Sequence, residues 1–214
     1  MTSIAQQVWS VIEKDVIIKR AIERGVVSSK NLAVYLSKKG VHASSDAIIS
    51  AIRRYNPSKT DAAFEKARKV IGKSEDIRIT TNIIEIAVEK TEQTQQLLQK
   101  AISLVDYNKG DVLLMIQGEK SIKVIINDKN KEKIMNLFSK KSIIHIEKDL
   151  AEINIQLSDE AVKTPGIVAT LTTELMVNNI PMFEIMSCVP ELLLFVKKKD
   201  VVKAYELLFK LCGQ

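Results

Sequence analysis

The segment with the clearest chemical potential is Thr164–Ile167, which reads Thr-Pro-Gly-Ile. A strand-like run, Ala151–Leu157, precedes this segment, and a helix-like run ending near Asn179 follows it. Backbone N–H groups at a helix N-terminus attract anions. A tight polar turn at such a position, beside a sheet edge, therefore suits a small anionic ligand such as an amino acid.

The chain carries no recognisable catalytic or metal-binding constellation. His42 and His145 are far apart in sequence, and neither has a cysteine neighbour at ligand spacing. Cys188 and Cys212 form neither a metal motif nor a disulfide framework. No Gly-x-x-x-x-Gly-Lys phosphate loop occurs. The sequence predicts a protein that is not an enzyme, with no cofactor, no metal site and no catalytic residue.

Positive charge is concentrated in the first third of the 214 residues. Residues 1–73 carry 14 Lys and Arg against 6 Asp and Glu, a net charge of +8, whereas residues 74–214 carry 18 against 20. This asymmetry indicates a nucleic acid or another polyanion as partner of the N-terminal segment. No apolar run reaches the roughly 18 to 20 residues of a membrane span, and no signal-peptide pattern opens the chain, so we expect a cytoplasmic protein without a membrane partner.

The basic segment 1–73 is expected to be a helical domain. Apolar residues recur at helical spacing, and serines and glycines punctuate them as caps do. Two expected helices end at Gly25 and at Gly40. A third runs from Ser44 to Tyr55, and a fourth from Thr60 to Ile71. Helix, short glycine-containing turn and helix is the helix-turn-helix arrangement.

In this arrangement the second helix carries serine and arginine side chains that face solvent. Arginine pairs with phosphate or reads guanine. The residues expected to contact double-stranded DNA are Ser44, Ser45, Arg53, Arg54 and Lys59. A basic face that is only solvated, on a dimerisation or linker unit, remains the alternative.

The remaining two thirds read as a duplicated unit of strands and helices. In the first copy, residues 74–148, we expect strands at 76–81, 83–88, 112–116 and 122–126, and helices at 91–105 and 129–138. In the second copy, residues 149–214, we expect strands at 151–157, 182–186 and 192–196, and a last helix at 200–211. The predicted fold class is therefore α+β, with split βαβ sheets whose helices lie on one face. The two sheets are expected to pack side by side or helix face to helix face.

Two local expectations concern the second copy. In strand 151–157, the odd-numbered residues Ile153, Ile155 and Leu157 are expected to point inward and the even-numbered residues outward. Pro165 is expected in the first turn of the next helix.

Segments 148–155 (KDLAEINI), 164–169 (TPGIVA), 179–187 (NIPMFEIMS) and 194–208 together resemble ACT domains, and the closest likeness is the regulatory region of aspartate kinases. The chain also resembles archaeal proteins described as predicted regulators of amino-acid metabolism. The resemblance implies two ferredoxin-like βαββαβ modules behind the helical domain. It also implies that strand 77–80, ahead of the first module, supplies the fourth strand that the second module lacks.

The resemblance further implies a ligand site at the loop after the first strand of the second module and at the start of its second strand. By position, the ligand-binding residues are Ser158, Asp159, Thr164, Pro165, Gly166, Ile167 and Met182. Backbone N–H groups would hold a ligand carboxylate, and Asp159 or Glu160 would pair with its ammonium group. The first module lacks the Pro-Gly turn and is expected to be degenerate.

Three functions follow as hypotheses. The favoured one is a homodimeric, ligand-responsive transcriptional regulator with an amino acid as effector. The alternative is a regulatory subunit that binds an amino acid and modulates a metabolic enzyme without contacting DNA. The third is an oligomerisation module with a vestigial pocket.

Overall fold

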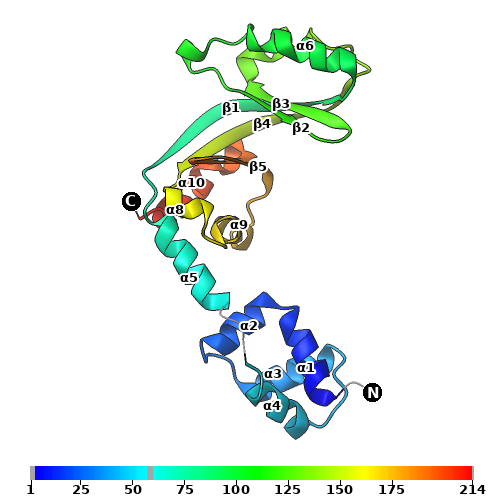
Figure 1. Cartoon of the computed structure of the whole chain (residues 1–214), viewed down its shortest axis with the longest axis vertical. Coiled ribbons are helices and arrows are strands. Elements are labelled where there is room, and N and C mark those ends of the chain that lie inside the picture. The colour runs from blue at the N-terminus through cyan, green and yellow to red at the C-terminus, as the bar shows by residue number, and fades with distance from the viewer. Residues whose placement is uncertain (1–2, 57–59, 214) are drawn as a thin grey trace. The chain divides into compact units, whose positions relative to one another are not determined.

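The computed structural model describes residues 3–56 and 60–213, and the chain divides into two compact units at residues 1–69 and 70–214 (Figure 1). We describe each unit separately. The first contains α1 (Ile4–Glu13), α2 (Val16–Glu23), α3 (Ser29–Lys38), α4 (Ser45–Arg53) and most of α5 (Thr60–Ile71).

Short polar side chains set the helix starts in the first unit. Ser28 and Ser44 cap α3 and α4 by accepting hydrogen bonds from Asn31 N and Ala47 N, as their sequence positions predicted. Asp15 accepts from the backbone N–H groups of Ile17 and Ile18. This cap starts a new helix and divides the helical run between Val8 and Ile22 into α1 and α2.

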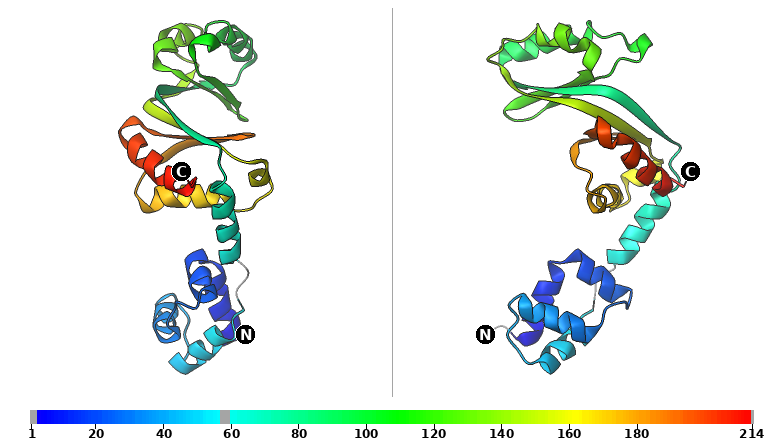
Figure 2. Two further views of the ribbon diagram at one scale, coloured as in Figure 1. Left: turned by 90° about the vertical axis from the view of Figure 1, so that its left-hand side faces the viewer. Right: turned by 180° about the vertical axis from the view of Figure 1, so that it is seen from behind.

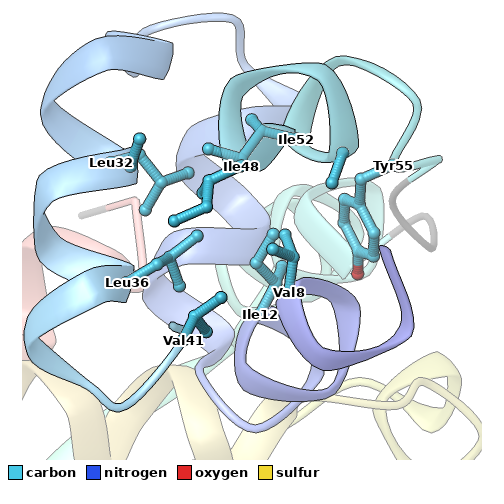
Figure 3. Packing of buried hydrophobic residues seen from close by; sticks show 10 residues of the cluster. Val8, Ile12, Leu32, Leu36, Val41, Ile48, Ile52 and Tyr55 are labelled. Carbon is cyan, nitrogen blue, oxygen red and sulfur yellow. The ribbon is translucent and has the colours of Figure 1, made fainter. Parts of the chain in front are cut away.

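A small apolar core holds the first unit together (Figure 3). Trp9 extends it with a polar contact, donating its ring N–H to the Ala51 carbonyl of α4 at 2.9 Å. Because Ala51 lies near the end of α4, this bond satisfies a carbonyl that the helix leaves unpaired. The core side chains come from α1, α3, α4 and the residues on either side of α4, and include Val8, Ile12, Leu32, Leu36, Val41, Ile48, Ile52 and Tyr55.

The second unit is built on one six-stranded antiparallel sheet with strand order β2-β3-β1-β4-β6-β5. Its strands are β1 (Asp76–Glu89), β2 (Leu113–Gln117), β3 (Ser121–Asn127), β4 (Ile143–Gln156), β5 (Met182–Cys188) and β6 (Glu191–Lys197). Its helices are α6 (Glu92–Ile102), α7 (Lys131–Met135), α8 (Asp159–Val162), α9 (Ile167–Val177) and α10 (Val201–Leu211), with short 3-10 turns at Tyr107–Lys109, Asp128–Asn130 and Lys198–Asp200.

The two central strands, β1 and β4, each run through both halves of this unit. Residues 76–80 of β1 pair with residues 152–156 of β4, beside β6, and residues 85–88 pair with the N-terminal part of β4, beside β3. The prediction that the strand at 77–80 serves the second half is therefore confirmed. The two strands expected at 76–81 and 83–88 form one strand, in which Asn82 has a positive φ of 59°. Asp149, at the same place in β4, has a φ of 56°.

The helices of the two halves lie on opposite outer sides of the sheet (Figures 1 and 2). On the first half, α6 and α7 pack against side chains such as Ile84 and Ile86. The neighbouring residue Ile83 points the other way and joins a second core with Leu193 and Phe195 of β6. The halves thus meet through their helix-free faces, and neither the side-by-side nor the helix-to-helix packing expected from the sequence describes them.

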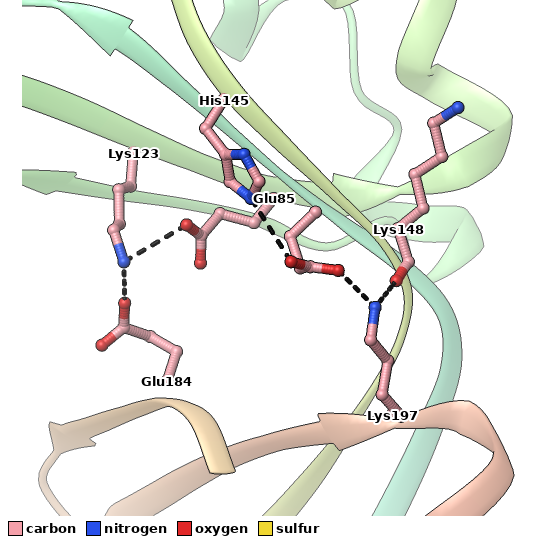
Figure 4. Close-up of polar contacts among 7 residues, drawn as sticks. Glu85, Lys123, His145, Lys148, Glu184 and Lys197 are labelled. Atoms are coloured by element: carbon pink, nitrogen blue, oxygen red, sulfur yellow. Dashed lines mark hydrogen bonds and ion pairs between the residues drawn. The ribbon is translucent and has the colours of Figure 1, made fainter. Parts of the chain in front are cut away.

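Charged side chains lie between these helix-free faces (Figure 4). Lys123 of β3 forms an ion pair with Glu184 of β5 and a second one, 3.2 Å long, with Glu85 of β1. In sheet order β3 and β5 are separated by three strands, so this pair ties the two halves together. Burial opposes the charge on Lys123, but the hydrogen bonds that its ammonium group donates to Glu184 and Glu85 leave the pKa of Lys123 above its ordinary value.

The burial of Glu152 shows that one face of strand 151–157 is not exposed to solvent as expected. The alternation holds, but the face expected to be in solvent is covered, and Glu152 is only 6% exposed. Residue Phe195 lies opposite it on β6 and is fully buried.

Candidate functional site

A pocket of about 310 Å³ opens beside the Thr164–Ile167 turn, at the end of the sheet where β4 and β5 finish. We call it the Gly166 pocket. It is lined by the end of β4, α8, the start of α9, the β5–β6 turn and the start of β6, through Leu157, Ala161, Val162, Thr164, Gly166, Ile167, Val168, Ala169, Ser187, Val189, Pro190, Glu191 and Leu192.

The turn at this pocket depends on Gly166. Its φ of 91° lies in the left-handed region, where a side chain is strained, and it is the N-cap residue of α9. Because glycine offers no capping side chain, the first-turn N–H groups of α9, from Ile167 to Ala169, have no acceptor within their own helix. Pro165 precedes the cap and is not in the first helical turn, which corrects the expectation for that residue.

The corresponding helix of the first half starts differently. Thr91 caps α6, and its side chain accepts a hydrogen bond from Thr94 N at 3.1 Å. One N–H group in the first turn of α6 is therefore already satisfied, whereas the start of α9 has no side-chain cap.

Of the seven residues expected to bind ligand, three line the Gly166 pocket: Thr164, Gly166 and Ile167. Met182 lies at the other end of β5, since it pairs with Val196, whereas Cys188 at the pocket end pairs with Glu191. The remaining three expected residues flank the pocket without lining it: Ser158, Asp159 and Pro165. Ser158 Oγ is buried and has no hydrogen-bond partner among the described residues.

Two acidic side chains near the pocket already have partners. Glu160 pairs with Lys73 at 2.8 Å, on the outside of α8. Glu191 accepts a hydrogen bond from Asn154 Nδ2 at 2.9 Å. The buried Thr164 hydroxyl donates to the Glu160 carbonyl at 2.8 Å, which holds the turn against α8.

The apolar walls of the pocket were not expected from the sequence. Val162 belongs to α8, a helix of four residues that is too short for a periodic signal. The sequence predicts a turn at Val189–Glu191; the structure places Val189 and Pro190 in the turn and Glu191 in β6. The position of this turn beside α9 follows only from the way the second half folds.

In the first unit, α3 and α4 flank the turn that contains Gly40. Ser45, Arg53 and Arg54 are exposed on α4, and Ser44 is its N-cap. Lys59, also expected to contact DNA, lies outside the described residues. An exposed acidic residue, Asp46, shares the helix with the two arginines.

Among residues 3–56 and 60–213 there is no group of histidine, cysteine and acidic side chains that could hold a metal ion. The same residues contain no helix that is both long enough and apolar enough to cross a membrane.

No protein-family model and no curated protein matches this sequence. Solved structures do match part of this chain. The regulatory subunit of aspartate kinase from Thermus flavus superposes with a TM-score of 0.53 at 9% identity, over 64% of this chain and 97% of that chain. For the ligand-free regulatory subunit from Thermus thermophilus the TM-score is 0.52 at 10% identity, with 64% and 97% covered.

Aspartate kinase from Clostridium acetobutylicum, described as an allosteric enzyme, matches with a TM-score of 0.51 at 22% identity, over 66% of this chain and 35% of that chain. At these identities the likeness establishes the fold alone. The chain has a mixed helix and antiparallel-sheet fold similar to that of aspartate kinase regulatory subunits.

Proposed function

We propose that this protein is an amino-acid-sensing regulator and not an enzyme. In this proposal residues 1–73 form a helix-turn-helix-like unit, residues 74–148 a degenerate ACT-like module, and residues 149–214 a ligand-binding ACT-like module. The observation that carries the proposal is the Gly166 pocket, because it combines a helix start without a side-chain cap and a volume suited to a small ligand.

The effector carboxylate would lie against the first-turn N–H groups of α9, where the helix dipole also favours negative charge. A homodimer in the cytoplasm would respond by changing how its helical units bind double-stranded DNA. Linkage requires that the effector bind one arrangement of the dimer more tightly than the other.

The alternative is a regulatory subunit that binds an amino acid and modulates a metabolic enzyme. Similarity of the chain to structures described as regulatory subunits of aspartate kinase favours this reading. It shares the effector pocket with the first proposal and differs in the role of the helical unit.

A thermal-shift screen of the full chain against the twenty amino acids tests the sensing function. Binding of an effector at about 100 times its Kd stabilises the folded state by ~2.7 kcal/mol, which raises Tm by about 5 to 10 °C. For Gly166→Ala, at least ten times more ligand should be needed to reach the same shift in Tm. The reason is that a Cβ at a φ of 91° strains the turn that presents the N–H groups.

Gly118→Ala is the matched control, since the φ of Gly118 is not positive and a Cβ there meets Ser121 O only at 3.4 Å. This variant should keep the full ligand response. Absence of a saturable shift with every amino acid would refute the sensing function and leave an oligomerisation module.

A further inference from the structure

The walls of the Gly166 pocket are formed mainly by aliphatic side chains, which come from several elements. Leu157 comes from the end of β4, Leu192 from β6, and Val162 from α8. Ile167 and Val168 of α9 and the turn residues Val189 and Pro190 complete the apolar surface.

Among the described residues that line the pocket, Glu191 alone is ionisable, and its carboxylate is bonded to Asn154. Successive side chains of a strand point to opposite faces, so Glu191 and its neighbour Leu192 lie on different sides of the sheet. The Glu191 carboxylate accepts from Asn154 on the side away from Ile153 and Ile155. The described lining therefore offers a ligand no charged side chain.

The polar groups that remain are few. The Thr164 hydroxyl donates to the Glu160 carbonyl, which leaves the first-turn N–H groups of α9 and the Ser187 hydroxyl. Those N–H groups suit a carboxylate. The volume of about 310 Å³ lies at the lower end of the roughly 300 to 1,000 Å³ found for small-molecule pockets.

We infer that the ligand of the Gly166 pocket is a small carboxylate with an uncharged aliphatic side chain. This inference rests on the proposed sensing function. The carboxylate lies at the start of α9, and the aliphatic chain packs against Val162, Ile167 and Leu192. A charged side chain would lose its hydration without gaining a partner. The two sources of this chemistry are a branched-chain amino acid and the corresponding 2-oxo acid.

Titration calorimetry on the full chain tests the inference, with leucine, isoleucine, valine and 4-methyl-2-oxopentanoate compared with lysine, aspartate and threonine. The aliphatic ligands should bind at least about 100-fold more tightly than lysine or aspartate, because only the charged side chains lose hydration unpaired. Binding of the amino acid, of the oxo acid or of both supports the inference and identifies the source.

A matched pair of variants locates the site. Val162 and Val177 are each 61% exposed, so neither substitution to aspartate disturbs the core, but only Val162 lines the pocket. Val162→Asp should weaken aliphatic ligands at least tenfold, and Val177→Asp should leave their binding unchanged.

Two results would overturn the inference while the sensing function stands: tighter binding of lysine or aspartate, or equal effects of the two aspartate variants. If no amino acid or oxo acid binds, the sensing function itself fails, so the two failures are distinguishable.

Discussion

At the scale of single residues, Glu152 is a carboxyl group that is almost fully buried, at 6% exposed. It lies between the two halves of the second unit, with Thr80 and Phe195 opposite it on the neighbouring strands. Burial, together with the negative charge of Glu191, raises the pKa of Glu152 to about 7. A carboxyl group in this position is more stable protonated than ionised.

This pKa predicts a pH dependence of stability. The folded state binds the Glu152 proton more tightly than the unfolded state, so the free energy of unfolding should fall as pH rises from about 4.5 to about 7. Glu152→Gln should be more stable than the wild type by about 1 to 3 kcal/mol near pH 8 and nearly equal to it near pH 4. Urea unfolding at several pH values measures this difference.

Glu206→Gln, at an exposed position of α10, serves as the control and should follow the wild-type pH profile. An unchanged pH slope in Glu152→Gln would show that ionisation of Glu152 is not what weakens the fold.

At the scale of elements, the second unit depends on two strands that cross between its halves. Asn82 of β1 and Asp149 of β4 occupy equivalent places, and each has a positive φ. The pairing of β1 and β4 shifts its register beside Asn82, and such irregularities increase strand twist. The kinked strands let the helix-free faces meet around Ile83, Leu193 and Phe195.

The ion pairs of Lys123 provide a test of this contact. Lys123→Met keeps the aliphatic stem but leaves the buried Glu85 and the half-buried Glu184 without their shared cation. We expect a loss of about 1 to 3 kcal/mol in the free energy of unfolding, less than for a fully buried pair because Lys123 is partly exposed. Denaturant unfolding gives the value.

Lys120→Met, in the exposed turn that precedes β3, is the matched control and should change stability by less than about 0.5 kcal/mol. Equal effects of the two substitutions would contradict a role of the Lys123 ion pairs in joining the halves.

At the scale of the whole molecule, the charge asymmetry separates a basic helical unit from a sheet unit with a small negative charge. Such a division is expected of a protein in which one part binds a polyanion and another part senses a ligand. The exposed arginines of α4 are the residues through which this proposal is tested most directly.

If the protein is a DNA-binding regulator, the full chain should bind double-stranded DNA. The logarithm of its affinity should then fall linearly with the logarithm of the salt concentration. Arg53→Ala combined with Arg54→Ala should reduce the affinity and lower the salt slope by about 2, because two phosphate contacts are lost. The effector should change the affinity by about 5- to 150-fold. Fluorescence anisotropy measures all three effects.

Lys140→Ala, at an exposed position of the second unit, is the control and should leave DNA binding unchanged. Effector binding without any salt-dependent DNA binding would favour the enzyme-regulating alternative.

Features set by neighbouring residues could be predicted from the sequence. The serine caps of α3 and α4 and the α5 helix depend on interactions within a few residues. The Thr164–Ile167 turn was expected as the centre of a candidate site because a Pro-Gly pair before a helix-like run is a local signal, and the structure gives Gly166 a positive φ there.

The sequence by itself determined where most helices and strands lie and where positive charge is concentrated, because both are properties of short stretches of chain; it did not predict α8 or the full length of β4. Only the tertiary structure decided that β1 and β4 cross between the halves, that Glu152 is buried, and that Val162 and Leu192 form walls of one pocket. These features join residues that are distant in sequence, and their physical cause is the packing of one half against the other. Periodicity predicts which face of a strand is apolar, but it cannot predict what will cover the opposite face.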